Sequence, residues 1–416
     1  MFKNELTRKV SSKRIYIWNA VANLCNAAST VLFMLIITRI LGTVQGGIFS
    51  VAFALSQQML TVANFETATY QITESKNSFT FGTYLFSRTL LYVLSILVGF
   101  LVAFFSSYSL YKTVAVVLLC MYKGLDAFNA TFSALMQRKG RLDIGCKALA
   151  IRIIVSVIIF AFSAVIFKDL LVSIALMLAF SIIWMFLYEI KYTSYFEKIK
   201  FDYAFSKTLK LILECFPMFL GSFLLIYICN SPKYVLDSVM RDETVNTVFG
   251  VIFMPSSIIS LLSIFIYRPV LTELTRFWAN GEIKRFISKI LSLALFIFGA
   301  SAFCIGVAYL CGTQILGTIY GLDLSEYKFT LCVCLLGGTM YALASLVYNA
   351  IVILRRQRIM IFCYLAASTV SLLVSPILVD KFSLLGAVIA YLISCSVLCI
   401  LISVLFAVLV AKHKKA

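Results

Sequence analysis

The chain has 416 residues, of which 62% are hydrophobic and only 13% are charged. A soluble domain does not carry so much apolar sequence, so the composition excludes a soluble globular protein and indicates a polytopic membrane protein. The formal net charge is +18, but the lysines and arginines lie in short turns between apolar runs. That placement is typical of membrane topology signals and argues against a nucleic-acid-binding face.

Apolar runs long enough to cross a bilayer as a helix need about 20 residues. Twelve such runs are predicted as spans, at 15–41, 44–66, 83–108, 112–135, 146–167, 170–190, 208–230, 246–268, 286–312, 328–354, 357–379 and 383–411. With a cytoplasmic N-terminus, 27 of the 36 basic residues fall in inner segments and seven fall at outer turns. This bias predicts that both termini are cytoplasmic and that the number of spans is even.

A weak internal repeat divides the chain into two halves. The run Phe49-Ser-Val-Ala-Phe53 recurs 200 residues later as Phe249-Gly-Val-Ile-Phe253. We therefore expect an all-α membrane protein with a first six-helix bundle over residues 1–200 and a second over 201–416. Six spans per half is an even number, so the halves should be related by a pseudo-two-fold axis along the membrane normal, with a substrate path between them.

Polar side chains recur at helical spacing on one face of the first two spans. They are Asn19, Asn23 and Asn26 in the first span, and Gln57 and Asn64 in the second. A polar lumen would need such stripes, but hydrogen bonds between membrane helices use the same residue types. Both interpretations stay open from the sequence.

Three charged residues interrupt apolar spans in the first half: Lys123, Asp126 and Arg152. A charge in the middle of a membrane helix costs about 2.5–3.5 kcal/mol on insertion scales, and it usually faces the protein interior or a water-filled path. We therefore predict that these residues bind substrate. Alternatively, Lys123 and Asp126, at i and i+3, neutralise each other. In the same interpretation, the long aliphatic side chain of Arg152 extends so that its guanidinium reaches the inner membrane boundary.

Four further residues near the ends of spans are candidates for binding. Arg39 and Lys233 occupy matching outer ends of the first and seventh spans, where they would contact an anion or anchor the helix at the interface. Glu66 and Glu214 are the carboxylates most nearly within spans. They are candidates for a coupling proton or sodium ion, or for salt bridges.

No catalytic group is apparent. The sole histidine is His413 in the C-terminal tail, and there is no Walker or GxGxxG phosphate loop. The outer loops are short, and the 12 cysteines form no paired metal-ligand spacing, so they are expected to be buried thiols. The sequence predicts a protein that is not an enzyme and has no cofactor or metal. A membrane-embedded glycan polymerase or acyltransferase is an alternative that would need a catalytic set.

Five segments carry a resemblance to a known group of transporters. They are ITRILGTVQGGIFSVAFALSQQ (37–58), YQITESKNSFTFGTYLFSR (70–88), LDAFNATFSALMQRKGRLDIGCKALAIR (125–152), ECFPMFLGSFLLIYICNSPKYVLDSVM (214–240) and FGVIFMPSSIISLLSIFIYRPVLTEL (249–274). In their order and spacing they resemble the bacterial polysaccharide and O-antigen flippases (the Wzx or PST group) of the multidrug/oligosaccharidyl-lipid/polysaccharide exporter superfamily. One departure is Ala68, at a position where many relatives carry arginine.

The resemblance implies a transporter in the bacterial inner membrane that works by alternating access. Its substrate would be an undecaprenyl-pyrophosphate-linked oligosaccharide repeat unit, moved to the outer leaflet for capsule, O-antigen (lipopolysaccharide) or exopolysaccharide synthesis. The basic lumen residues of the group correspond to Arg39, Lys123, Arg152 and Lys233. Partners implied are the bilayer, a polysaccharide polymerase and a chain-length regulator. A cation-coupled multidrug exporter of the same superfamily is the alternative.

Overall fold

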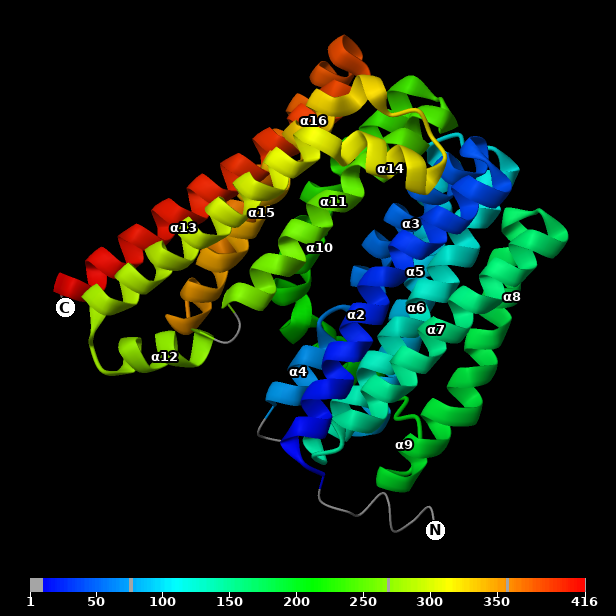
Figure 1. Cartoon of the computed structure of the whole chain (residues 1–416). Coiled ribbons are helices and arrows are strands. Elements are labelled where there is room, and N and C mark those ends of the chain that lie inside the picture. The colour runs from blue at the N-terminus through cyan, green and yellow to red at the C-terminus, as the bar shows by residue number, and fades with distance from the viewer. Residues whose placement is uncertain (1–9, 75–77, 268–269, 357–358, 416) are drawn as a thin grey trace. The chain divides into compact units, whose positions relative to one another are not determined.

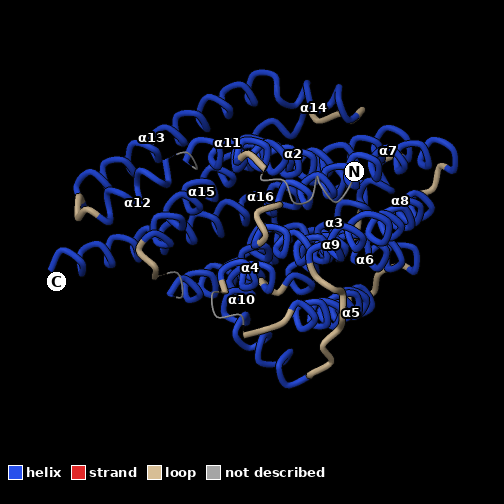
Figure 2. The backbone as a smooth tube through the Cα atoms, turned by 90° about the horizontal axis from the view of Figure 1, so that it is seen from below, coloured by secondary structure: helices blue, strands red, loops and turns tan. Residues whose placement is uncertain are grey.

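The chain is an all-α, multi-pass membrane protein. The computed structural model describes residues 10–74, 78–267, 270–356 and 359–415, and no strand occurs in these ranges. Figure 2 shows helix along almost all of this part of the chain, with short loops between the helices. A helix satisfies its own backbone hydrogen bonds, which is what an apolar chain in lipid requires.

The chain divides into two compact units, one ending at Phe223 and one beginning at Leu224. We call them the N-terminal and C-terminal bundles and describe each by itself. The division lies inside helix α10 (Phe205–Met240), whereas the sequence placed it near residue 200, in the segment before that helix. The first half of α10 thus packs with the N-terminal bundle, so the seventh span is shared.

Long helices make up most of the N-terminal bundle, with short helices and turns between them and the first half of α10 at its end, as Figure 1 shows. In chain order the elements are α2 (Ser12–Ile36), the π-helical turn η1 (Ile37–Leu41), α3 (Thr43–Asn64), α4 (Thr67–Thr73), α5 (Phe81–Phe105), α6 (Leu110–Arg138), α7 (Leu142–Phe167), α8 (Leu170–Trp184), the π-helical turn η2 (Met185–Ile190) and α9 (Lys191–Phe196).

Helix α6 is the centre of this bundle, since it contacts α3, α5, α7 and α8. Helices α2 and α7 lie side by side, as Figure 1 also shows. Aromatic rings pack around Phe33 of α2, which lies 6.0 Å from Phe49 of α3 and 5.1 Å from Phe160 of α7, measured between ring centroids. Any polar residue on the inner face of α6 is therefore removed from lipid by neighbouring helices.

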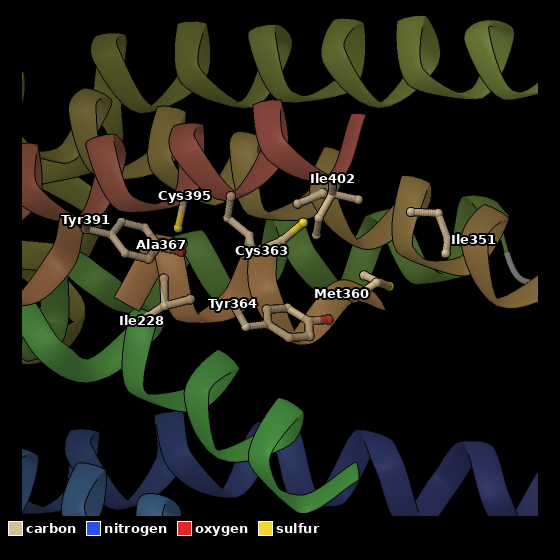
Figure 3. Packing of buried hydrophobic residues seen from close by; sticks show 11 residues of the cluster. Ile228, Ile351, Met360, Cys363, Tyr364, Ala367, Tyr391, Cys395 and Ile402 are labelled. Carbon is tan, nitrogen blue, oxygen red and sulfur yellow. The ribbon is translucent and has the colours of Figure 1, made fainter. Parts of the chain in front are cut away.

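The C-terminal bundle holds the second half of α10 and the helices that follow it. These are α11 (Glu243–Tyr267), α12 (Leu271–Ala279), α13 (Ile283–Val307), the π-helical turn η4 (Ala308–Gly312), α14 (Thr313–Tyr320), the 3₁₀ turn η5 (Ser325–Tyr327), α15 (Lys328–Ile353) and α16 (Met360–Lys415). Here α15 is central, because it contacts α11, α13 and α16. Figure 3 shows part of the core, where Ile228 of α10 lies near Tyr364, Tyr391 and Cys395 of α16.

Eleven segments in the described ranges are long and apolar enough to cross a membrane. The last of them is two helices joined at Ser383, whose φ of 49° and ψ of −125° are not helical. The described residues therefore hold twelve helices that are long and apolar enough to cross a membrane, and the predicted fold class of about twelve membrane helices in two six-helix bundles is confirmed. The predicted two-fold axis stays a prediction. The sequence missed the short helices α4, α9, α12 and α14.

The internal repeat occupies equivalent positions in the two bundles. Helices α3 and α11 are each the second span of their bundle, and they begin at Thr43 and Glu243. In α3 the rings of Phe49 and Phe53 stack with centroids 5.2 Å apart, and in α11 those of Phe249 and Phe253 stack at 5.7 Å. The central helices α6 and α15 are likewise the fourth spans of the two bundles.

Candidate substrate-binding site

Four charged side chains meet inside the N-terminal bundle. Lys123 and Asp126 lie one turn apart on α6, and the lysine Nζ is 3.3 Å from the aspartate Oδ2. The guanidinium of Arg152, on α7, donates to the other oxygen of Asp126. The Nε of Arg152 also lies 3.9 Å from Oε1 of Glu189, on the π-helical turn η2. We call these four residues the charge cluster.

The charge cluster is almost fully buried. The side chains of Lys123, Arg152 and Glu189 are 3%, 1% and 1% exposed, and that of Asp126 is 18% exposed. Two cations and two acids balance when all four are ionised, which offsets part of the cost of removing charges from water. Asp126 is the most accessible member and bonds both cations, so a ligand reaching the cluster would meet it first.

Aromatic rings help to hold the Lys123 ammonium in place. Its Nζ lies 5.0 Å from the ring centroid of Phe53, on α3, and 5.8 Å from that of Tyr122. Such contacts stabilise a buried cation by about 0.5–2 kcal/mol. They leave the ammonium hydrogens free to bond oxygen.

The structure brings Lys123, Asp126 and Arg152 together, and the contact between Arg152 and Asp126 was not predicted. Lys123 and Asp126 do pair, and Arg152 does not lie at an exposed boundary but packs against Asp126 inside the bundle. Pairing is compatible with substrate binding, because an anion can replace a carboxylate at a cation. A role for the three residues in binding therefore remains a prediction.

Glu189 was missed by the sequence reasoning, which looked for carboxylates elsewhere. It stands at the end of the predicted sixth span, where a charge reads as an interfacial residue. Its burial follows from the position of η2 against α6 and α7, and these contacts are not visible in the hydropathy pattern. The signal that could have found Glu189 is that it and Arg152 are isolated charges of opposite sign, so that they could pair.

A second buried arginine, Arg88 of α5, lies inside the bundle and is 0% exposed. Its Nε donates to Thr131 at 2.7 Å and its Nη2 to Thr67 at 2.8 Å, while Nη1 donates to the backbone carbonyl of Ala63. Ala63 lies in the last turn of α3, which ends at Asn64, and Thr67 begins α4, so the arginine fixes the break between these helices.

The polar stripes are only partly enclosed. Asn23 and Asn26 are exposed on α2, and Asn23 donates to the backbone and side-chain oxygens of Asn19 at 2.8 and 2.9 Å. Gln57 and Asn64 are half-buried on α3. None of these four predicted residues contacts the charge cluster in the interactions described. Both interpretations, that they line a polar lumen or that they form hydrogen bonds between helices, therefore remain open.

Arg39 and Lys233 belong to different bundles. Arg39 is exposed on η1. Lys233 is half-buried in the second half of α10, with its ammonium 5.9 Å from the ring of Phe249 and 5.8 Å from that of Phe253. Phe53 and Phe253, which correspond in the repeat, thus each face a lysine, although the two lysines come from helices that do not correspond.

Glu66 immediately precedes helix α4, and Glu214, on α10, contacts α4 through Tyr70. Both Phe65 and Glu66 have left-handed backbone, with φ of 43° and 55°, so α3 and α4 meet at an elbow. Glu66 accepts a hydrogen bond from Thr69 at 2.7 Å, and Glu214, on α10, accepts one from the phenol of Tyr70. Neither carboxylate belongs to the charge cluster, and their predicted role in ion coupling remains untested.

No protein-family model matches the chain, and the comparison with curated proteins found no match. Solved structures do match. The structure resembles a lipid II flippase, MurJ, in an inward closed conformation with a TM-score of 0.72 at 13% identity, over 93% of this chain and 87% of that one. It resembles an inward-facing multidrug resistance MATE family transporter of the MOP superfamily with a TM-score of 0.69 at 12% identity, over 94% and 96%.

A third match is the eukaryotic MATE transporter AtDTX14. Its TM-score is 0.62 at 13% identity, with 97% of this chain and 98% of that one covered. Identities this low establish shared architecture and leave the substrate open. The chain therefore has the two-bundle fold found in these transporters and in the MurJ flippase.

Proposed function

We propose that this protein is a flippase that moves an undecaprenyl-pyrophosphate-linked oligosaccharide from the cytoplasmic to the outer leaflet, by alternating access. The observation that carries the proposal is the charge cluster, in which Lys123 and Arg152 are buried beside the more accessible Asp126. A diphosphate is a ligand suited to a lysine and an arginine, since both donate charge-assisted hydrogen bonds to its oxygens.

Two further features support a polar, anionic substrate. The polar stripe of α2 is exposed in a helix that is otherwise apolar enough to span a membrane. Its amides are suited to replacing water around sugar hydroxyls. An inward-negative membrane potential would favour outward movement of the headgroup by about 2.3 kcal/mol per charge per 100 mV.

The decisive experiment is complementation of a bacterial strain that lacks its own polysaccharide flippase, together with translocation of a fluorescent lipid-linked oligosaccharide in vesicles. Lys123→Ala and Arg152→Ala should each lower translocation at least tenfold while the protein still reaches the membrane. Arg285→Ala, which removes an exposed cation of the C-terminal bundle, is the matched control and should transport normally. Normal transport by both cluster variants would refute the role of the cluster.

A multidrug exporter is the second candidate, and the likeness to the MATE transporter favours it. An exporter of cationic drugs would need more acids than cations in its site, whereas the charge cluster holds two of each. Drug efflux from cells that express the protein, with no translocation of the lipid-linked sugar, would select this alternative. Catalytic turnover of the glycan would instead indicate a polymerase or acyltransferase.

A further inference from the structure

Glu189 differs from the other acid of the charge cluster in its bonding. Its side chain is 1% exposed, yet neither carboxylate oxygen has a hydrogen-bond partner. The nearest cation, the Nε of Arg152, is 3.9 Å away, beyond hydrogen-bonding distance. Asp126, in contrast, accepts from both Lys123 and Arg152.

The groups that face Glu189 come from two helices. Arg152 reaches it from α7, while Asp126 and Asn129 act on it from α6. Asn129 is 4% exposed, and its amide interacts with Glu189 without reaching hydrogen-bonding geometry. On its own helical segment, the neighbouring Tyr188 stacks on Trp184 with ring centroids 4.9 Å apart. Glu189 therefore faces one cation, one anion and one amide.

An ionised carboxylate without hydrogen bonds is costly to bury, while the neutral acid costs much less. Glu189 can accept or release a proton without breaking any hydrogen bond that the cluster now makes. The same change at Asp126 would break two. Among the cluster residues, Glu189 is thus the group that best accommodates a change of protonation.

We propose that Glu189 is a proton-binding site that controls anion binding at the charge cluster. With Glu189 ionised, Lys123 and Arg152 balance the two acids and the net charge is zero. With Glu189 protonated, the net charge is +1 and the cluster attracts a diphosphate. By linkage, binding of the anion must then favour protonation by the same factor.

A proton fits this site better than a metal cation does. The positively charged guanidinium of Arg152 lies 3.9 Å from the carboxylate and would repel a sodium ion that approached it. A proton forms a covalent bond with the oxygen and removes the negative charge, so it needs no further ligands. This inference rests on the proposed function, since it takes the ligand to be an anionic diphosphate headgroup.

The test is direct binding to the purified full-length protein in lipid nanodiscs. The probe is a short-chain polyprenyl-diphospho-N-acetylglucosamine, a diester whose charge is constant over the pH range used. Wild type should bind it on the order of tenfold to a hundredfold more tightly at low pH than at high pH. Calorimetry in buffers of different protonation heats should show proton uptake on binding. Replacing choline chloride by sodium chloride should change nothing.

Glu189→Gln keeps the shape of the protonated acid and should bind at every pH as tightly as wild type does at low pH. Glu282→Gln, an exposed acid outside the cluster, should keep the wild-type pH dependence. Wild-type binding that is independent of pH, or that depends on sodium, overturns the proton site but leaves the proposed function standing. Failure of wild type to bind the probe at any pH overturns both. If the glutamine variant does not fold, proton uptake by wild type alone decides.

Discussion

The phenol of Tyr70, on α4, donates a hydrogen bond to the carboxylate of Glu214, on α10. The residues are 144 positions apart in the chain. Beside them the rings of Phe65 and Phe219 stack with centroids 4.0 Å apart and planes within 10°. Together these contacts fasten the elbow between α3 and α4 to the first half of α10.

The hydrogen bond to Glu214, together with burial, raises the pKa of Tyr70 above its usual value, so the phenol stays a donor to higher pH than an ordinary tyrosine does. Tyr70→Phe should lower the free energy of unfolding by about 1–2 kcal/mol, because it removes a hydrogen bond to a charged acceptor. Glu214→Gln keeps an acceptor and should lose less. The measurement is the melting temperature of the purified protein in detergent. Transport that becomes insensitive to pH in Glu214→Gln would instead support the ion-coupling role.

Arg88 should be the most sensitive position of α5. Arg88→Ala removes three hydrogen bonds and leaves Ala63, Thr67 and Thr131 without their partner, so we expect a loss of roughly 3–5 kcal/mol. Arg88→Lys retains the charge but cannot reach three acceptors and should be intermediate. Thermal unfolding of the purified variants measures this order. A melting temperature equal to that of wild type for Arg88→Ala would contradict it.

The connection between α9 and α10 should be sensitive to acid. The amide of Ala204, followed by the Thr83 hydroxyl and the Lys207 ammonium, holds the pKa of Asp202 below its usual value. The ionised form is therefore favoured by folding, so its contribution is present above the unfolded pKa of about 3.9 and is lost as the pH falls through the folded value.

Asp202→Asn should remove this part of the acid sensitivity. Melting temperatures of wild type and variant should differ at neutral pH and converge at low pH. A constant difference across the whole titration would show that the charge of Asp202 does not contribute.

Gly386 marks the close approach of the two halves of α16. A Cβ at this position would lie 1.9 Å from the carbonyl oxygen of Leu378, across the break at Ser383. Gly386→Ala should therefore destabilise the C-terminal bundle by about 2 kcal/mol or more. Gly299→Ala is the control: a Cβ at Gly299, inside α13, meets nothing within 4 Å, and should stabilise slightly. Equal melting temperatures for both variants would contradict the assigned contact.

Much of the fold could be predicted because lipid makes hydropathy informative. The predicted spans 83–108 and 328–354 correspond to α5 (Phe81–Phe105) and α15 (Lys328–Ile353) within a few residues. The elbow at Phe65 could not be predicted, because no glycine or proline marks its left-handed residues. Its geometry depends on Arg88, which is distant in sequence and reads as a topology signal.

The candidate site was predictable in part for a related reason. Lys123, Asp126 and Arg152 interrupt apolar runs, and such charges are noticeable because they are costly. Glu189 lies at a predicted span end, where charge is common. Glu189 completes the cluster because of the way in which α6, α7 and η2 pack. Such packing between helices is difficult to predict from a single sequence.

The buried position of Arg88 has a consequence for how the protein is made. Its partner Thr131 lies 43 residues further along the chain, so α5 leaves the ribosome before α6 can supply that hydroxyl. During this interval the nascent chain offers Arg88 only Ala63 and Thr67. Helix α5 is thus stably inserted in the membrane only when α6 follows. A chain truncated between these helices would be degraded early by membrane proteases.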